Sequence, residues 1–201
     1  MNLSAPLTDV ASGTRGALLQ TLVRLERPVT RRQVATAASV NAGHASRVID
    51  DLISAGLVAE TKVGRSSLIA LNHDHLAAQS IVALAGLRGE LIRRLRERLT
   101  EWPDLSGAWL FGSVARSTSR PDSDIDVAIV AADLDSPDLH NRLALLQSNV
   151  TTWTGNDLQL VEHSPESWQM LKVSRNALVE QIRRDGIPLM DNDTSLLERV
   201  R

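Results

Sequence analysis

Two short apolar runs on either side of a polar turn, between residues 108 and 130, constrain the fold of this chain more than any other feature. The first run, Ala108 to Phe111, predicts a strand that leads directly into Gly112-Ser113. After a turn and a polar loop, the run from Ser123 to Val130 alternates acidic and apolar residues at its start and predicts a second strand. The segment therefore predicts two facing strands with a Gly-Ser turn between them.

The second of these strands carries two carboxylates on one face. Because side chains alternate along a strand, Asp124 and Asp126 point the same way while Ile125, Val127 and Ile129 enter the core. Two carboxylates this close repel each other unless a cation lies between them. Oxygen ligands of this kind suit Mg²⁺ or Mn²⁺, which commonly bridge substrate phosphates. The pair is therefore a predicted metal site.

The Gly112-Ser113 turn has the complementary chemistry. A glycine lets a phosphate approach the backbone, and the hydroxyl of Ser113 and the amides after it can bind a β- or γ-phosphate. A phosphate-binding loop facing two metal-binding carboxylates is the arrangement for in-line nucleotidyl transfer with two metal ions. We expect a nucleoside triphosphate (NTP) as substrate.

The same residues resemble the nucleotidyltransferase superfamily typified by DNA polymerase β, above all its minimal bacterial members. Their pattern is Gly-Ser, an Ala-Arg-Gly turn and Ser-Asp-x-Asp on a strand, with Ser117 here in place of the turn glycine. The resemblance implies that Asp124 and Asp126 are catalytic. It also implies a nucleotide-binding set, although a surface ion pair accounts for its arginine equally well; the set is Gly112, Ser113, Arg116 and Ser123.

The resemblance further implies a third catalytic carboxylate on a later strand. The predicted strand from Asn156 to Glu162 offers Asp157, which shares a face with Gln159. Either Asp157 is the third ligand, or the position falls on Gln159 and the carboxylate is missing. As an Asp in a Gly-Asn-Asp sequence, Asp157 also fits a plain turn. A neutral Gln159 would leave a slow enzyme, or a nucleotide-binding domain without turnover.

The first third of the chain predicts a small helical module. Helices are expected over Thr14–Leu25, Thr30–Ala38 and His44–Ala55, followed by a hairpin around Gly64. This order resembles the winged helix-turn-helix of bacterial transcription regulators. The resemblance implies contacts with double-stranded DNA through the third helix and the wing; the residues are His44, Ser46, Arg47, Lys62 and Arg65. Such modules also serve in dimerisation or protein docking.

These segments give a two-domain chain that combines α+β and α/β features. A winged helix of three helices and a hairpin is joined by a long helix to a nucleotidyltransferase-like mixed sheet flanked by helices. The expected ranges are 1–12 for a loose N-terminus, 13–73 for the winged helix, 74–103 for the connecting helix, 104–190 for the nucleotidyltransferase-like domain and 191–201 for a tail.

Composition excludes several classes of function. The 201 residues contain no cysteine, so disulfides and thiolate metal sites are excluded. No apolar run approaches the length of a membrane span, and the N-terminus lacks the features of a secretory signal, so we expect a cytoplasmic protein. With four Trp, one Phe and no Tyr, a stacking platform for single-stranded nucleic acid is not expected.

Three functions compete at this point. The first is a metal-dependent enzyme that transfers a nucleoside monophosphate from an NTP to a hydroxyl or amine on a protein, a small molecule or an RNA end. The family resemblance suggests a toxin–antitoxin setting with a protein acceptor. The second is a transcription regulator, of a class that often forms homodimers, that senses a nucleotide without turnover. The third is a protein-binding scaffold, which has no need for the acidic pair beside Gly112-Ser113.

Overall fold

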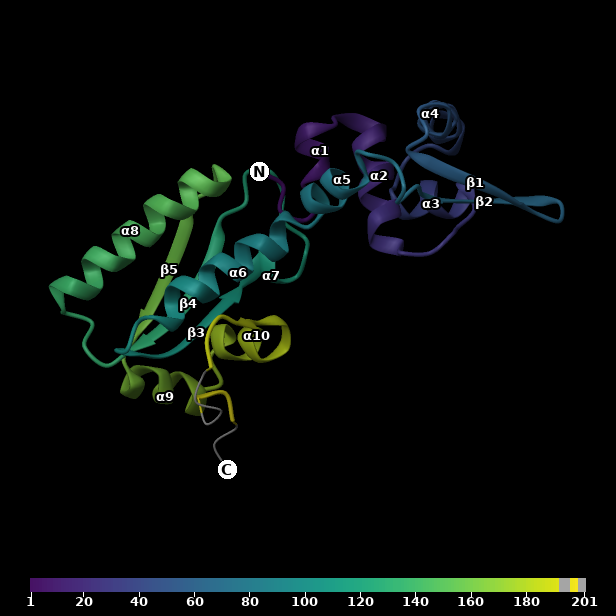
Figure 1. Ribbon diagram of the computed structural model, residues 1–201. Coiled ribbons are helices and arrows are strands. Elements are labelled where there is room, and N and C mark those ends of the chain that lie inside the picture. Colours follow the sequence, from purple (N-terminus) through teal and green to yellow (C-terminus); the bar gives the residue numbers. More distant parts are fainter. Residues whose placement is uncertain (192–195, 199–201) are drawn as a thin grey trace. The chain divides into compact units, whose positions relative to one another are not determined.

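The computed structural model describes residues 1–191 and 196–198, and its chain divides into two compact units (Figure 1). One unit is Ala5–Leu87, and the other combines Met1–Ser4 with Arg88–Arg201. Among the described residues no helix is long and apolar enough to cross a membrane.

The N-terminal unit contains helices and one hairpin, in the order that the sequence predicts. The hairpin strands pair antiparallel and extend away from the helices (Figure 1). Thr30 and Gln33 stand three residues apart, which is the spacing of a capping box, and they form one at the start of α3 (Arg31–Ala37). The elements are α1 (Leu7–Val10), α2 (Gly13–Leu25), α3 (Arg31–Ala37), α4 (Ala42–Ser54), β1 (Val58–Val63), β2 (Ser66–Leu71) and α5 (Ala78–Ala85).

This unit has its own apolar core, formed where α2, α3 and α4 meet the base of the hairpin. Leu18, Val34, Ile49 and Leu52 are fully buried there. The isolated bridge between Val29 and the strand β2 ties the chain before α3 to the hairpin. Beyond its first residue β1 is exposed along its whole length, so the outer part of the hairpin adds little to this core.

The C-terminal unit is built on a four-stranded mixed sheet in the order β5-β4-β3-β6. Strand β4 is parallel to β5 and antiparallel to β3, which also pairs antiparallel with β6. This confirms the predicted mixed sheet flanked by helices. The elements are α6 (Leu87–Thr100), β3 (Leu105–Phe111), α7 (Gly112–Ala115), β4 (Ile125–Ala131), α8 (Pro137–Thr154), β5 (Leu158–His163), α9 (Pro165–Val173), α10 (Ala177–Asp185) and β6 (Ile187–Pro188).

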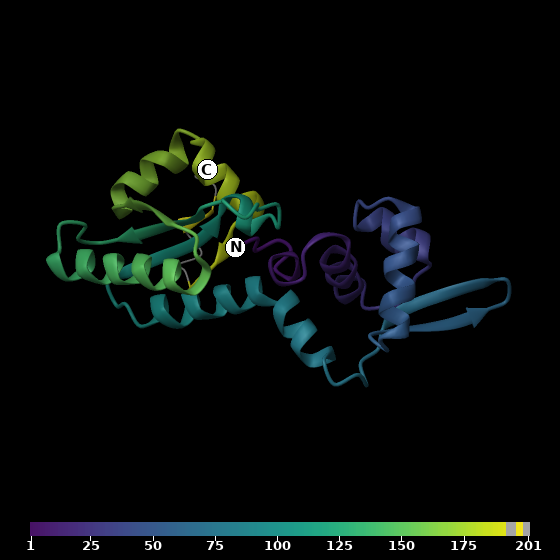
Figure 2. The same cartoon turned by 90° about the horizontal axis from the view of Figure 1, so that it is seen from above.

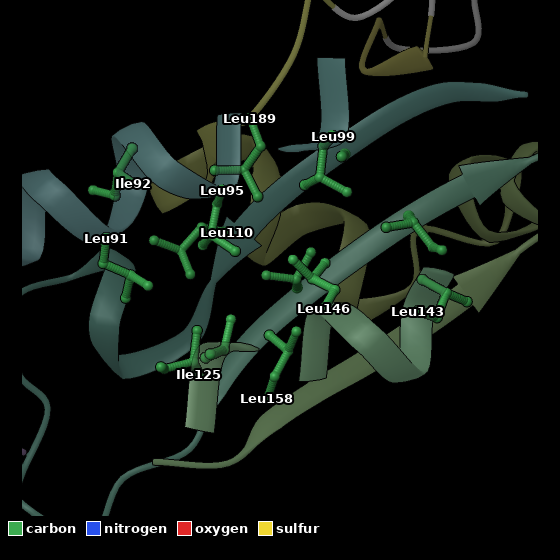
Figure 3. Close-up of a cluster of buried hydrophobic side chains, with 14 of the residues drawn as sticks. Leu91, Ile92, Leu95, Leu99, Leu110, Ile125, Leu143, Leu146, Leu158 and Leu189 are labelled. Atoms are coloured by element: carbon green, nitrogen blue, oxygen red, sulfur yellow. The ribbon is translucent and has the colours of Figure 1, made fainter. Parts of the chain in front are cut away.

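Helices cover both faces of this sheet, with α6 and α8 on one side and α9 and α10 on the other (Figure 2). The apolar residues of α6 and α8 pack on Leu110, Ile125 and Leu158 (Figure 3). On the opposite face Trp109 and Trp168 stack with ring centroids 5.1 Å apart and an interplanar angle of 4°. Both faces of β4 are therefore buried, except near its start.

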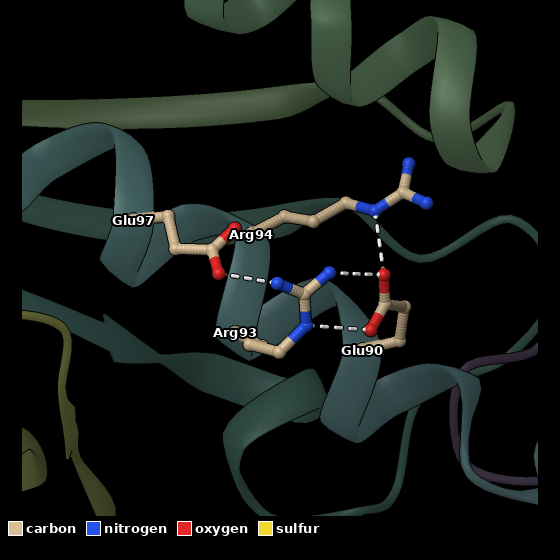
Figure 4. A network of polar contacts seen from close by, with 4 residues as sticks. All are labelled: Glu90, Arg93, Arg94 and Glu97. Carbon is tan, nitrogen blue, oxygen red and sulfur yellow. Dashed lines mark hydrogen bonds and ion pairs between the residues drawn. The ribbon is translucent and has the colours of Figure 1, made fainter.

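The exposed side of α6 is laced with ion pairs (Figure 4). Arg93 and Arg94 both bond Glu90, and Arg93 also bonds Glu97 one turn further on. Hydrogen bonds from Arg93 and Arg94 lower the pKa of the Glu90 carboxyl to about 2. The opposite charges on this side of α6 therefore pair with one another on a solvent-exposed surface.

Two segments differ from the sequence-based expectation. The first twelve residues, expected to be loose, contain the helix α1 and bury Leu3 and Leu7, because each of these leucines fits into the core of a different unit. The single connecting helix is instead two helices that meet at Gly86. Helix α5 belongs to the N-terminal unit, and α6 from Arg88 onward belongs to the C-terminal unit.

The predicted tail lies partly outside the described residues. Of 191–201, positions 192–195 and 199–201 are not described. The three residues between them bond to α9 and α10: the indole N–H of Trp168 donates to the carbonyl of Leu196 at 2.8 Å, and Arg183 donates to those of Leu197 and Glu198 at 2.8 and 3.1 Å.

Asn156 joins the loop before β4 to the chain before β5, and its side chain is only 5% exposed. Its Nδ2 donates to the carbonyls of Pro121 and Ser123, at 3.1 and 2.8 Å, and its Oδ1 accepts from the α-amino group of Met1 at 2.8 Å. Replacing it removes the hydrogen-bond partners of three partly buried polar groups, which is costly.

We therefore expect Asn156→Ala to lower the free energy of unfolding by about 1–3 kcal/mol. Urea unfolding followed by tryptophan fluorescence measures this, because Trp102, Trp109, Trp153 and Trp168 all lie in the C-terminal unit. Asn72→Ala is the matched control, since its Nδ2 donates to Gly56 within the N-terminal unit. If Asn156→Ala unfolds at the same urea concentration as the wild type, the hydrogen bonds of Asn156 do not stabilise the C-terminal unit.

Candidate functional site

The structure brings the Gly-Ser turn and the acidic pair together. Strand β3 ends at Phe111, which pairs with Asp126 on β4, and α7 begins at the next residue. Gly112 has φ +72°, and a Cβ atom built there would lie 2.0 Å from Oδ2 of Asp126. Only glycine satisfies both the backbone angle and this close approach. The carboxylate of Asp126 therefore lies against the backbone of the predicted phosphate-binding turn.

The turn itself is short and tightly bonded. The amide of Arg116 donates to the carbonyl of Gly112, and that of Thr118 donates to the carbonyl of Ser113 at 2.9 Å. Ser117 closes the turn with φ 57°, in the left-handed region that costs a non-glycine residue roughly 1 kcal/mol. This angle gives a physical reason for the glycine that the resemblance leads us to expect at this position.

The charges around Asp126 favour a cation. Burial raises the pKa of the Asp126 carboxyl, the negative charge of Asp124 raises it further, and the guanidinium of Arg116 lowers it. Asp124 is exposed and Asp126 half-buried, so the pair opens toward solvent at one end. Arg116 also lies 4.0 Å from Oδ2 of Asp185 on α10. This position of Arg116 is consistent with a phosphate ligand and with a surface ion pair, the two roles considered for it above.

Ser123, predicted to bind nucleotide, organises the loop before Asp124. Its hydroxyl accepts a hydrogen bond from the amide of Arg120 at 2.8 Å, and its own amide donates to the carbonyl of Arg120 at 3.1 Å. The side chain is half-buried. A role toward nucleotide remains a prediction for this residue.

The register of β4 and β5 bears directly on the third carboxylate. Asp126 pairs with Gln159, so a neutral amide stands beside the half-buried acid. Asp157 is exposed and precedes β5, where its carbonyl accepts a hydrogen bond from the amide of Ile125 at 2.9 Å. Within the described ranges, no three His, Cys, Asp or Glu side chains gather closely enough to hold a metal ion. A catalytic role for Asp157 beside Asp124 and Asp126 therefore remains a prediction.

In the N-terminal unit, the residues predicted to contact DNA lie on α4 and on the hairpin. His44 and Arg47 are exposed, as are Lys62 and Arg65 around the hairpin turn. Ser46 is half-buried and accepts a hydrogen bond from Arg31 at 3.2 Å, which ties it to α3.

One residue that contacts the turn was not indicated by the sequence. Arg88 donates from Nε to the carbonyl of Val114 at 2.7 Å and from Nη2 to the carbonyl of Ala115 at 2.6 Å. It sits on α6 in a row of arginines, and no local pattern distinguishes it from the arginines that pair with glutamates. Only the packing of α6 on α7 reveals this contact.

A mixed sheet that places a Gly-Ser turn against an acidic pair is the arrangement that the resemblance to nucleotidyltransferases led us to expect. Residues 93–195 match the family model described as polymerase beta, nucleotidyltransferase. The match spans just over half of the 201 residues. The chain therefore belongs to this nucleotidyltransferase family, and the matched range lies within the C-terminal unit.

Similar solved structures include two toxin–antitoxin crystal structures and an archaeal protein. A toxin–antitoxin structure with AMP-PNP is 25% identical with a TM-score of 0.34, covering 54% of this chain and 75% of that one. A variant of the toxin–antitoxin pair MntA-HpeT is 23% identical with a TM-score of 0.35, covering 55% and 77%. The ST1889 protein of the thermoacidophilic archaeon Sulfolobus tokodaii is 22% identical with a TM-score of 0.33, covering 45% and 97%. No curated protein matches this chain.

The raised pKa of Asp126 predicts a dependence of stability on pH. Between the ordinary carboxyl pKa and the raised one, the folded state holds the proton more tightly than the unfolded state, so stability falls as pH rises through this window. In metal-free buffer at pH 7 we expect Asp126→Asn to have a higher Tm than the wild type. The difference should shrink as the pH falls toward the ordinary carboxyl pKa of about 4, because the unfolded state also begins to bind the proton there.

Thermal unfolding between pH 4 and 7 in the presence of EDTA measures this difference. Asp122→Asn, which removes an exposed carboxylate from the preceding loop, is the control and should show no comparable gain. A Tm for Asp126→Asn below that of the wild type at pH 7 would show that the charged form is not destabilised by its surroundings.

Proposed function

We propose that this chain is a metal-dependent nucleotidyltransferase that transfers a nucleoside monophosphate from an NTP to a hydroxyl or amine acceptor. The carrying observation is the position of the Asp126 carboxylate against Gly112, where a Cβ would lie 2.0 Å from it. A carboxylate in contact with a phosphate-binding turn allows one cation to contact both the acid and the phosphates of a bound NTP. Membership of the nucleotidyltransferase family supports the same activity.

The residues present fit a divalent cation. Asp124 and Asp126 supply oxygen ligands, and the charge of one raises the pKa of the other, so a cation would stabilise both in their ionised forms. Mg²⁺ is typically bound by one or two carboxylates together with substrate phosphates, and Mn²⁺ accepts the same oxygen ligands. When bound, the metal would polarise the phosphate oxygens and lower the barrier to displacement.

The protein residues would bind and orient the triphosphate. The backbone at Gly112 has no Cβ to keep a phosphate away, and Ser113 can donate a hydroxyl hydrogen bond. Arg116 lies close enough to influence the charge of Asp126 and is the candidate for a second phosphate contact. Transfer forms a bond from the acceptor oxygen or nitrogen to the α-phosphorus, breaks the bond to pyrophosphate and releases the acceptor proton. The resemblance to minimal nucleotidyltransferases makes a partner protein the first acceptor to test.

We expect Asp126→Ala to abolish metal-dependent NTP binding. Isothermal titration of ATP, GTP, CTP and UTP with Mg²⁺, and then with Mn²⁺, tests this directly. Asp122→Ala is the control, because that carboxylate is exposed in the loop and should leave binding unchanged. Circular dichroism shows whether each variant is folded. Equal affinity in Asp126→Ala and the wild type would exclude Asp126 as a metal ligand.

A nucleotide sensor without turnover is the second candidate for the same site. The observation that favours it is the pairing of Asp126 with Gln159, which places an uncharged side chain where a further anionic metal ligand would be needed for two cations. Both candidates require NTP binding. They differ in pyrophosphate release, which only the transferase shows when an acceptor protein is supplied.

For the N-terminal unit, with the winged helix proposed at 13–73, we propose binding to double-stranded DNA. The supporting observation is the neutralisation of the acidic groups near α4: Arg31 pairs with Asp50 at 2.6 Å and with Glu60 at 3.2 Å. Arg47 is exposed on that helix, and Lys62 and Arg65 on the extended hairpin. A helix flanked by such a hairpin matches the groove-binding geometry of winged helices.

We expect Arg47→Ala to weaken binding to a fluorescein-labelled duplex of random sequence by about tenfold, with a smaller dependence on salt. Fluorescence anisotropy at several salt concentrations measures both effects. Arg24→Ala, an exposed arginine on α2, is the control. If the two variants bind equally, α4 is not the DNA-contacting helix.

A further inference from the structure

The turn that carries Gly112 and Ser113 is too short to be stable by itself. Helix α7 has only four residues, and a single helical turn costs more in fixed backbone angles than its hydrogen bonds return. At its far end the carbonyl of Val114 accepts only short-range bonds within the turn, from the amide of Arg116 and from that of Ser117 at 3.2 Å. Ser117, two residues after the end of α7, adds the strain of a positive φ angle. Beyond these internal bonds, a contact from outside the turn would stabilise its far end.

Arg88 supplies this support. Its guanidinium donates two hydrogen bonds, at 2.7 Å to the carbonyl of Val114 and at 2.6 Å to that of Ala115. Both are charge-assisted, and both come from one rigid planar group, which fixes two adjacent carbonyls at once. The side chain is half-buried, so water competes less for these carbonyls than it would at an exposed site.

We infer that Arg88 is a positioning residue for phosphate binding: it touches no substrate, but by fixing the end of α7 it holds the backbone at Gly112 and Ser113 in the binding orientation. The part of this inference that concerns phosphate rests on the proposed function. Arg88 precedes the family match at 93–195 and is the first residue of the C-terminal unit after Leu87. The support for the turn thus comes from the segment that links the two units.

Hydrogen exchange of the full chain, without nucleotide, tests whether Arg88 holds the turn. In Arg88→Ala we expect the amides of residues 112–118 to exchange about tenfold faster than in the wild type. Arg88→Lys, which can restore one of the two bonds, should lie in between. Arg96→Ala is the matched control, because Arg96 lies on the same helix and donates to a different carbonyl, that of Pro188, at 3.0 Å. Unchanged exchange in Arg88→Ala would overturn the inference.

Titration with Mg²⁺ and either ATP or inorganic triphosphate tests the consequence for binding. Arg88→Ala should weaken both ligands by about the same factor, roughly tenfold, because the change lies at the phosphate end of the site. Arg96→Ala should leave both affinities unchanged, and Arg88→Lys should recover part of the loss. If Arg88→Ala speeds the exchange but leaves the affinity for both ligands unchanged, Arg88 stabilises the turn without affecting phosphate binding, and the inference fails.

The two experiments separate failure of this inference from failure of the proposed function. If the wild type binds neither ligand, the proposed function fails, whereas exchange still decides whether Arg88 holds the turn. If Arg88→Ala does not fold, as judged by circular dichroism, Arg88→Lys is compared with the wild type, and identical exchange and affinity in these two proteins would overturn the inference.

Discussion

The pairing of β3 with β4 is the constraint on which the candidate site depends. Because Phe111 stands opposite Asp126, the chain that leaves β3 must pass directly over the carboxylate as it turns into α7. The space between them accommodates no side chain at Gly112. A shift of one residue would turn Asp126 into the apolar core and separate it from the turn. The register of the two strands thus fixes the position of Asp126 relative to the turn at Gly112.

The sheet around this pair is rigid because both of its faces are covered. Aliphatic side chains of α6 and α8 fill one face, and the stacked indoles of Trp109 and Trp168 lie on the other. The site lies at the one end of β4 where burial is incomplete, which leaves Asp126 half-exposed and Asp124 exposed. Burial that raises the pKa of the Asp126 carboxyl and partial exposure of the same side chain therefore occur together at this strand end.

The segment between the two units is predicted as one helix but forms two. The sequence predicts one connecting helix over residues 74–103, and Glu90, Arg93 and Arg94 form ion pairs on the exposed side of its second half. The structure divides this helix at Gly86 because α5 packs into one core and α6 into another. The periodicity of apolar residues indicates that a segment is helical and which of its faces is apolar. It does not indicate which apolar core that face packs against.

The sequence by itself determined the elements and chemistry that are local in the chain. Alternation placed Asp124 and Asp126 on one face, the Gly-Ser turn followed its strand, and the capping box marked the start of α3, since each depends on neighbours a few residues away. The tertiary structure decided what depends on distant segments. The parallel register placed Gln159, and not Asp157, beside Asp126. Packing of α6 brought Arg88 to the end of α7, because side chains far apart in sequence meet only once the sheet and its helices have assembled.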